Sequence, residues 1–134
     1  MKKLLFIATI IFALATISSV FAHGTKEVKL SINKQTIASG SKLKIKLIEI
    51  EDSRCPEDVN CVWAGNAVIK FTVSKGKLAA KTFELNSGTE PMSVTYQGYE
   101  IKIKDITPNR KSAESGKLIE QSVILTIGKM PKKP

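Results

Sequence analysis

The chain has 134 residues, with 21 lysines and arginines against 12 acidic residues, which gives a formal net charge of +9 at pH 7. It contains one histidine and two cysteines, too few for the common zinc sites built from cysteine and histidine, and any catalytic triad would have to use His23. The sequence also lacks a glycine-rich phosphate loop and a basic motif interleaved with aromatic residues, which argues against P-loop chemistry and against nucleic acid as a partner.

The first 22 residues have the three parts of a secretory signal peptide. Two lysines form the basic start, residues 4–15 form the apolar core, and residues 20–22 form the cleavage site. A membrane anchor is the alternative, because residues 4–22 approach the roughly 20 residues that span a bilayer. Threonines and serines dilute this run, however, and no basic stop-transfer flank follows it directly. We therefore predict cleavage after Ala22, a mature chain without a membrane span, and a secreted or periplasmic location.

The mature chain would begin at His23 and fits one domain, residues 23–129, followed by a basic flexible tail, residues 130–134. Its lysines are scattered through the chain at alternating positions, which is typical of solvated strand faces. The alternative is contact with an anionic surface of the cell envelope.

Alternation of apolar and polar residues predicts strands in the first part of this domain. It runs through residues 28–32 and 43–47, and then slips by one position as Ile48 and Ile50 become the apolar set. A slip of one residue turns side chains to the opposite face of a sheet. We therefore predict a β-bulge, or a crossing between sheets, near Leu47 and Ile48.

The alternation resumes after residue 66. It predicts a strand over residues 67–73, a hairpin turn at residues 74–77, and a following strand through Phe83 and Leu85 that ends at residues 86–88.

The last part of the chain repeats this pattern. Residues 99–103 alternate, Ile106 breaks the phase, residues 108–116 are polar and predict a long loop, and residues 123–127 predict the final strand. No segment after residue 22 has sustained helical spacing. The sequence therefore predicts an all-β, immunoglobulin-like β-sandwich of about seven antiparallel strands, with a small β-barrel as the alternative.

The least generic segment, Asp52 to Gly65, contains both cysteines and the only tryptophan. Two cysteines in an exported chain predict one disulfide, Cys55–Cys61. A loop of that size stabilises the fold by roughly 2–2.5 kcal/mol in the chain-entropy description, and its direct effect is to fix the shape of the enclosed residues. Because rigid loops on β-sandwiches often bind partners, we predict a binding loop. Its candidate contact residues are Asp52, Arg54, Glu57, Asp58, Asn60 and Trp63. The alternative is a purely structural strand connection.

Two features of this loop have competing interpretations. We expect Trp63 to anchor the loop on the core, with Gly65 allowing a tight bend; an exposed Trp63 would instead be a contact residue. The acidic side chains and Asn60 could offer oxygens to calcium, or the acids could simply pair with Arg54 and nearby lysines at the solvent-exposed surface.

The sequence Asp-Ser-Arg-Cys-Pro, followed five residues later by Cys-Val-Trp-Ala-Gly-Asn-Ala, resembles a signature of small exported bacterial proteins of uncharacterised function. The motif covers residues 52–67, and the arrangement of strands around it is similar over residues 28–127. The resemblance implies export and a strand-rich fold, and it implies no activity. A mature start at His23-Gly24 also resembles copper-dependent polysaccharide monooxygenases, but the second histidine of their copper site is missing, so no cofactor or metal is predicted.

These observations favour an exported, monomeric, non-enzymatic binding module whose partner is an unidentified protein or envelope component. Two alternatives stay open: inhibition of a secreted peptidase, with Arg54 filling the protease pocket, and a calcium-stabilised structural domain.

Overall fold

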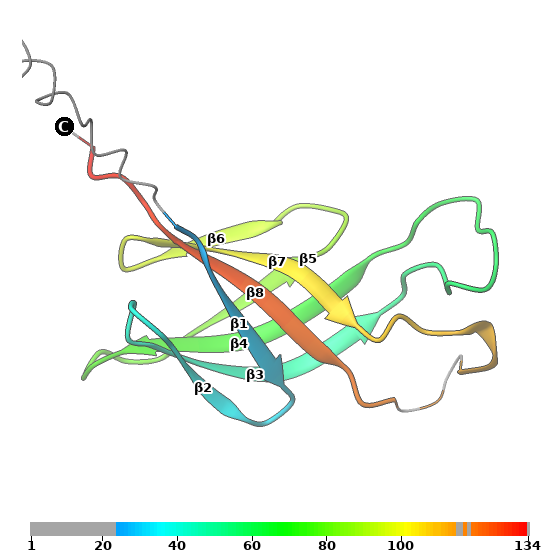
Figure 1. The fold of residues 1–134 in the computed structure, drawn as a ribbon, viewed down its shortest axis with the longest axis horizontal. Helices are drawn as coiled ribbons and strands as arrows, with labels where there is room; N and C mark the ends of the chain where they lie inside the picture. The colour runs from blue at the N-terminus through cyan, green and yellow to red at the C-terminus, as the bar shows by residue number, and fades with distance from the viewer. Residues whose placement is uncertain (1–23, 115–116, 118, 134) are drawn as a thin grey trace, which may run out of the picture.

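The computed structural model describes residues 24–114, 117 and 119–133, and these residues form two packed antiparallel sheets (Figure 1). The predicted signal peptide, residues 1–22, and His23 lie outside the described residues. The strands in chain order are β1 (Lys26–Ser31), β2 (Gln35–Ala38), β3 (Leu43–Asp52), β4 (Ala67–Lys75), β5 (Lys81–Asn86), β6 (Ser93–Tyr96), β7 (Tyr99–Thr107) and β8 (Ser122–Lys129). A 3-10 turn, Ser112–Glu114, lies between β7 and β8. The described part of the chain contains no helix long and apolar enough to cross a membrane.

The predicted β-sandwich is confirmed. One sheet has the order β1-β8-β7-β6 and the other the order β2-β3-β4-β5. Strands that follow one another in the chain are mostly neighbours, so the chain meanders through each sheet, whereas immunoglobulin domains follow a Greek key. The two sheets do not close into a barrel, so the alternative architecture is wrong.

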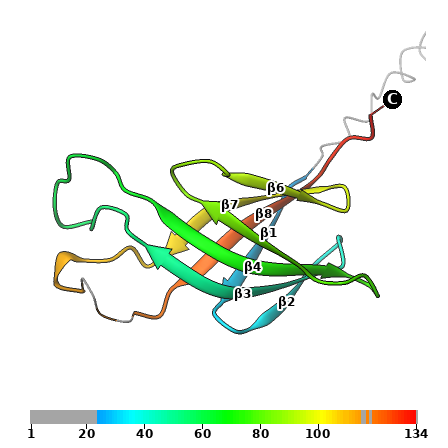
Figure 2. The same ribbon diagram turned by 180° about the vertical axis from the view of Figure 1, so that it is seen from behind.

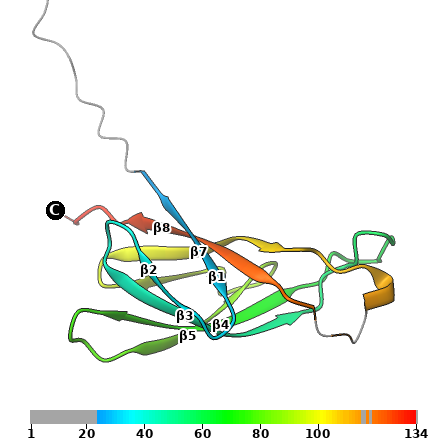
Figure 3. The same ribbon diagram turned by 60° about the horizontal axis from the view of Figure 1, so that its bottom comes forward.

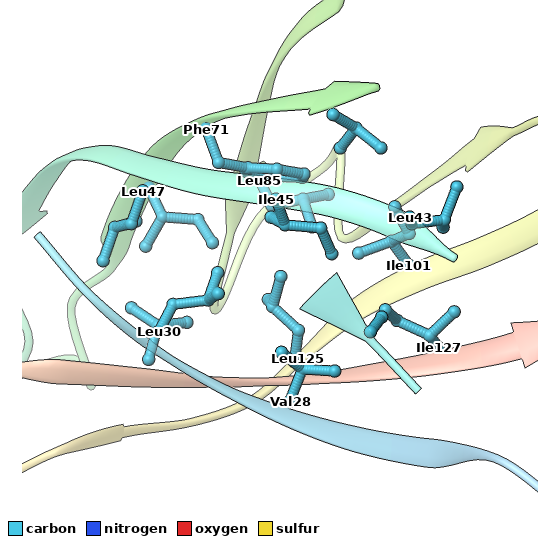
Figure 4. Close-up of a cluster of buried hydrophobic side chains, with 14 of the residues drawn as sticks. Val28, Leu30, Leu43, Ile45, Leu47, Phe71, Leu85, Ile101, Leu125 and Ile127 are labelled. Atoms are coloured by element: carbon cyan, nitrogen blue, oxygen red, sulfur yellow. The ribbon is translucent and has the colours of Figure 1, made fainter. Parts of the chain in front are cut away.

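The core lies between the inner faces of the two sheets, as the alternating pattern predicts. Inward-facing aliphatic residues of β1, β3 and β8 meet Phe71 of β4, Leu85 of β5 and Ile101 of β7 (Figure 4). Phe71, Leu85 and Ile101 are completely buried, and the lysines between the core positions of β3 point outward. Burial of apolar area at about 25 cal/mol per Å² is the main contribution to the stability of such a fold.

Two short strands, β2 and β6, are absent from the sequence-based prediction. Each has only four residues and buries one side chain, Ala38 in β2 and Tyr96 in β6. Both form outer edges of their sheets. An edge strand of four residues offers at most two inward positions, as Val94 and Tyr96 do in β6, and two positions are too few for an alternating pattern to be recognised.

Both predicted slips in the alternation of apolar and polar residues coincide with irregularities of strand pairing. The register between β3 and β4 shifts between Leu47 and Glu49, and that between β7 and β8 shifts between Ile103 and Asp105. After the first shift, the inward positions of β3 become Ile50 and Asp52. The bulge in β3 therefore turns an aspartate, the last residue of the strand, toward the interior.

Two long connections lie side by side at one end of the sandwich (Figures 2 and 3). Residues 53–66 join β3 to β4, and residues 108–121 join β7 to β8. In the sequence they are more than forty residues apart, but β3 and β7 end, and β4 and β8 begin, at the same end of the fold. The predicted loop at residues 108–116 is thus confirmed for its described residues, and it is a direct neighbour of the disulfide loop.

Candidate functional site

The base of the disulfide loop is a buried ion pair. The side chain of Asp52 is only 1% exposed, and a carboxylate this deeply buried needs compensation for its lost hydration. Arg54 provides it in a two-pronged arrangement: Nε donates to Oδ1 and an Nη donates to Oδ2, both at 2.8 Å. Such bidentate pairs are the strongest and most directional of protein ion pairs.

The same ion pair connects the two loops. The Arg54 guanidinium also donates to the carbonyl of Ile106 at 3.0 Å, at the end of β7. From the other side, Gln121 Nε2 donates to Asp52 Oδ2 at 2.7 Å and to the carbonyl of Pro108 at 3.1 Å. Gln121 is buried, so these bonds form away from solvent. We call Asp52, Arg54 and Gln121 the clasp.

The clasp controls the protonation of its two charged groups. Burial alone would raise the pKa of Asp52, but the hydrogen bonds from Arg54 and Gln121 and the positive charge of Arg54 outweigh burial and hold that pKa below its usual value. The hydrogen bond to Asp52 raises the pKa of Arg54 against the opposing effect of burial. Both groups therefore remain ionised at neutral pH.

The expected pairing of Arg54 with an acid of the loop is present, but the pair does not lie at the solvent-exposed surface. Only 19% of its side chain is exposed, and its partner Asp52 is buried. The bulge in β3 is the reason, because it turns Asp52 inward and brings the following turn over the end of the core.

The loop is closed at its neck by backbone hydrogen bonds and by one glycine. Ser53 donates its amide to Asn66 O at 2.9 Å, and Cys55 donates its amide to Ala64 O at 2.8 Å. Gly65 has a φ of +74°, and a Cβ there would lie 2.2 Å from Ser53 O. Only glycine permits both this backbone conformation and this close approach. The predicted tight bend at Gly65 is therefore confirmed.

Asn66 ties the neck to a third segment, the connection after β5. Its side-chain amide donates to Asn86 Oδ1 at 2.8 Å, and its Oδ1 accepts from the amide of Gly88 at 2.9 Å. Ser87 Oγ accepts a hydrogen bond from the backbone amide of Ala67 at 2.9 Å. Residues 53–66 are therefore supported from both sheets.

The outer part of the loop is held by the disulfide and by the neighbouring loop. The predicted disulfide Cys55–Cys61 is present, with Cα atoms 5.9 Å apart. Asp58 accepts hydrogen bonds from both the amide and the hydroxyl of Ser112, each at 2.7 Å, and these bonds lower the pKa of Asp58. Glu57 donates its amide to Arg110 O at 3.0 Å.

The acidic side chains of the loop do not converge on a common point. Asp52 points inward to the clasp, and Asp58 points to Ser112. Over the residues described, no group of three or more histidine, cysteine or acidic side chains is arranged to hold a metal ion. The geometry therefore does not support the calcium interpretation of this loop.

The expectation that Trp63 anchors the loop on the core is wrong. Trp63 is 66% exposed, Val62 is fully exposed and Val59 is 43% exposed. The polar clasp and the glycine neck hold the loop instead, so the loop does not need an apolar anchor in the core. We call the exposed residues Val59, Val62 and Trp63 the apolar tip.

The predicted site residues thus fall into two groups. Asp52, Arg54 and Asp58 hold the loop, while Glu57 and Asn60 are exposed beside the apolar tip. Gln121, which completes the clasp, was missed because nothing in its sequence surroundings marks it. The bridging role of Asn66 was likewise not predicted, because no local pattern indicates it.

Comparison with known proteins identifies no relative of this chain. No protein-family model, no curated protein and no solved structure matches this chain.

Replacing Asp52 with alanine should lower the free energy of unfolding by about 3 kcal/mol at pH 7, because it leaves the partly buried Arg54 charge without its partner. The low native pKa means that Asp52 stabilises the fold fully above its unfolded pKa of about 3.9, and that this contribution disappears as the pH falls through the native pKa. The difference between wild type and variant should therefore shrink below about pH 4.

Urea unfolding at pH 7, 5 and 3 measures this difference. Glu51→Ala is the matched control, because it removes one exposed carboxylate from the adjacent position of β3 and should cost less than about 0.5 kcal/mol. A difference between wild type and the Asp52 variant that stays constant with pH would contradict the assignment.

Gly65→Ala should destabilise the protein by about 3 kcal/mol or more, because it adds a backbone clash to an unfavourable φ. Gly76→Ala is the control, since Gly76 has a φ of +58° and a Cβ added there would have nothing within 4 Å; it should cost only about 1 kcal/mol. Equal losses in thermal or urea unfolding would show that the close approach at Gly65 is unimportant.

Proposed function

We propose that this protein is an exported, non-enzymatic binding module that contacts its partner through the apolar tip of the disulfide loop. The observation that carries the proposal is the exposure of Val59, Val62 and Trp63 on a loop that is fixed from below by the clasp and laterally by the disulfide. The partner would be a protein or another component of the cell envelope.

Rigid support and exposed apolar side chains together favour binding. Ordering a flexible loop on association costs about 0.5–1.5 kcal/mol for each immobilised side chain, and a loop that is already ordered avoids much of this cost. Tryptophan is enriched among the residues that dominate interface energies. A solvent-exposed Trp63 adds nothing to the packing of the core, so its burial in an interface would be a net gain.

The polar part of the contact surface would be smaller than the sequence alone indicates. Glu57 and Asn60 are exposed and lie in the same loop as the tip. Arg54 and Asp52 are occupied in the clasp, and Asp58 is occupied by Ser112. We therefore propose an apolar centre with a rim formed by Glu57 and Asn60.

Export is supported by two independent features. The disulfide belongs in an oxidising compartment, and the first 22 residues have the composition of a signal peptide. The resemblance of residues 52–67 to the signature of small exported bacterial proteins agrees with this location. A non-enzymatic role is proposed because the chain has a single histidine and no recognisable catalytic motif.

Peptidase inhibition through Arg54 is not favoured by the geometry. An inhibitory arginine must project from its loop to enter a protease pocket. The Arg54 side chain instead turns back to Asp52 and to the carbonyl of Ile106.

Photo-crosslinking in the native organism tests the proposal. A photoreactive amino acid at position 62 should give a discrete covalent adduct with one partner. The same amino acid at position 78 should not, because Leu78 is also exposed but lies at the turn between β4 and β5, at the opposite end of the sandwich. In a pull-down with tagged protein that lacks the photoreactive amino acid, the double substitution Val62→Ser with Trp63→Ser should abolish capture of that partner.

Stability measurements separate loss of contact from loss of fold. Since Val62 and Trp63 are exposed, the double variant should keep its free energy of unfolding within about 0.5 kcal/mol of wild type. Identical adduct patterns from positions 62 and 78, or a double variant that retains the partner, would reject the proposal.

A further inference from the structure

A second candidate site lies at the end of the sandwich opposite the clasp. A hollow of about 200 Å³ opens there, where β1 and β7 begin, β8 ends, and a turn joins β2 to β3. The lining residues that matter for binding are Lys26, Ser39, Gly40, Tyr99, Ile127 and Lys129. Because one water molecule occupies about 30 Å³ of liquid, the hollow can hold a small ligand group of several atoms.

The lining of the hollow is positively charged. It contains two lysines, Lys26 and Lys129, and no carboxylate. A third ammonium group is close by, because Lys75 Nζ lies 5.1 Å from the centre of the Tyr99 ring. Among the described residues, none of these three lysines has a carboxylate within ion-pair distance, whereas Lys70, Lys102 and Lys104 on other parts of the sheets do.

One of these lysines lies close to the backbone turn that borders the hollow. Gly40 has a φ of +83°, and a Cβ at that position would meet Cε and Nζ of Lys26 at 3.4 Å. The ammonium group of Lys26 therefore lies against the turn, beside Ser39 and Ser41, which also line the hollow. A larger residue at position 40 would narrow the space between the turn and β1.

We propose that this hollow binds a phosphate group of a phosphate ester. A phosphate monoester carries a charge of about −1.5 to −2 near neutral pH, which two ammonium groups can match. Lysine binds phosphate as a point charge and does not need the planar pairing by which arginine selects carboxylates; no arginine lines the hollow. The Ser39 hydroxyl can add a neutral donor, whereas the Ser41 hydroxyl is already donated to the carbonyl of Ala38, and the ring of Tyr99 with Ile127 offers an apolar wall for the organic part of the ester.

Chemical-shift titration of the ¹⁵N-labelled protein tests this proposal with glycerol 1-phosphate as the probe and galacturonate as the carboxylate control. Shifts should saturate with a dissociation constant of the order of 1 mM, and should centre on Gly40, Ser41, Ile127 and Lys129. Galacturonate should bind at least about fivefold more weakly, because it has a single negative charge.

Two double variants with equal charge provide the matched comparison. Lys26→Gln with Lys129→Gln should raise the dissociation constant at least about tenfold, whereas Lys29→Gln with Lys46→Gln should change it less than about twofold. Lys29 and Lys46 are exposed strand residues outside the hollow. All four positions are exposed, so circular dichroism should show an unchanged fold and melting temperature in both variants.

Vesicles identify the source of the phosphate. If vesicles that contain phosphatidic acid, whose headgroup is a phosphate monoester, sediment the protein in a manner that depends on Lys26 and Lys129, and phosphatidylcholine vesicles do not, the ligand is a lipid headgroup. If only glycerol 1-phosphate binds, it is a soluble or polymer-borne ester; both results support the proposal. Shifts that do not saturate up to about 50 mM, equal binding of galacturonate, or equal losses in both double variants would overturn it. None of these results bears on the apolar tip, which lies at the other end of the fold.

Discussion

The disulfide loop depends on one carboxylate turned toward the interior. The bulge in β3 gives Asp52 this orientation, and burial makes its charge costly unless it is fully paired. Arg54 and Gln121 provide the pairing, and in doing so they bring together the ends of β3, β7 and β8. Buried ion pairs contribute little net stability when compared with apolar replacements, but loss of one partner is severe. The clasp therefore acts mainly to select one arrangement of the two long loops.

Because the clasp fixes the disulfide loop at its base, the outer surface of the loop does not need to pack on the core and can be apolar. The Cys55–Cys61 disulfide closes a short ring, so its effect is local, and the hydrogen bonds of Asp58 and Glu57 to the neighbouring loop complete the support. None of these contacts uses Trp63, whose exposure is therefore not required by the packing of the fold. This exposure is the basis of the proposed function, because tryptophan is enriched among the residues that dominate interface energies.

The predictable parts of the fold were those with a repeating physical signal. Alternation located β3, β4, β7 and β8. The slips after Leu47 and at Ile106 located the bulges, because at each slip the inward-facing residues change from odd-numbered to even-numbered positions. The edge strands β2 and β6 carry one buried residue each and have no such signal. Trp63 was misplaced because hydrophobicity alone cannot separate a core anchor from a contact residue. Gln121 could not be found, since its role depends on a partner 69 positions away in the chain.

Hydrogen exchange of individual amides tests most directly whether the clasp holds the loop. The amides of Cys55 and Glu57 donate to Ala64 and Arg110, so in the wild-type protein both should be protected well above open-chain rates. In the nearly isosteric variant Asp52→Asn, both should lose protection together by at least about tenfold beyond any change at Phe71 in the centre of β4. Unprotected Cys55 and Glu57 amides in the wild type, or unchanged protection in the variant, would contradict the account.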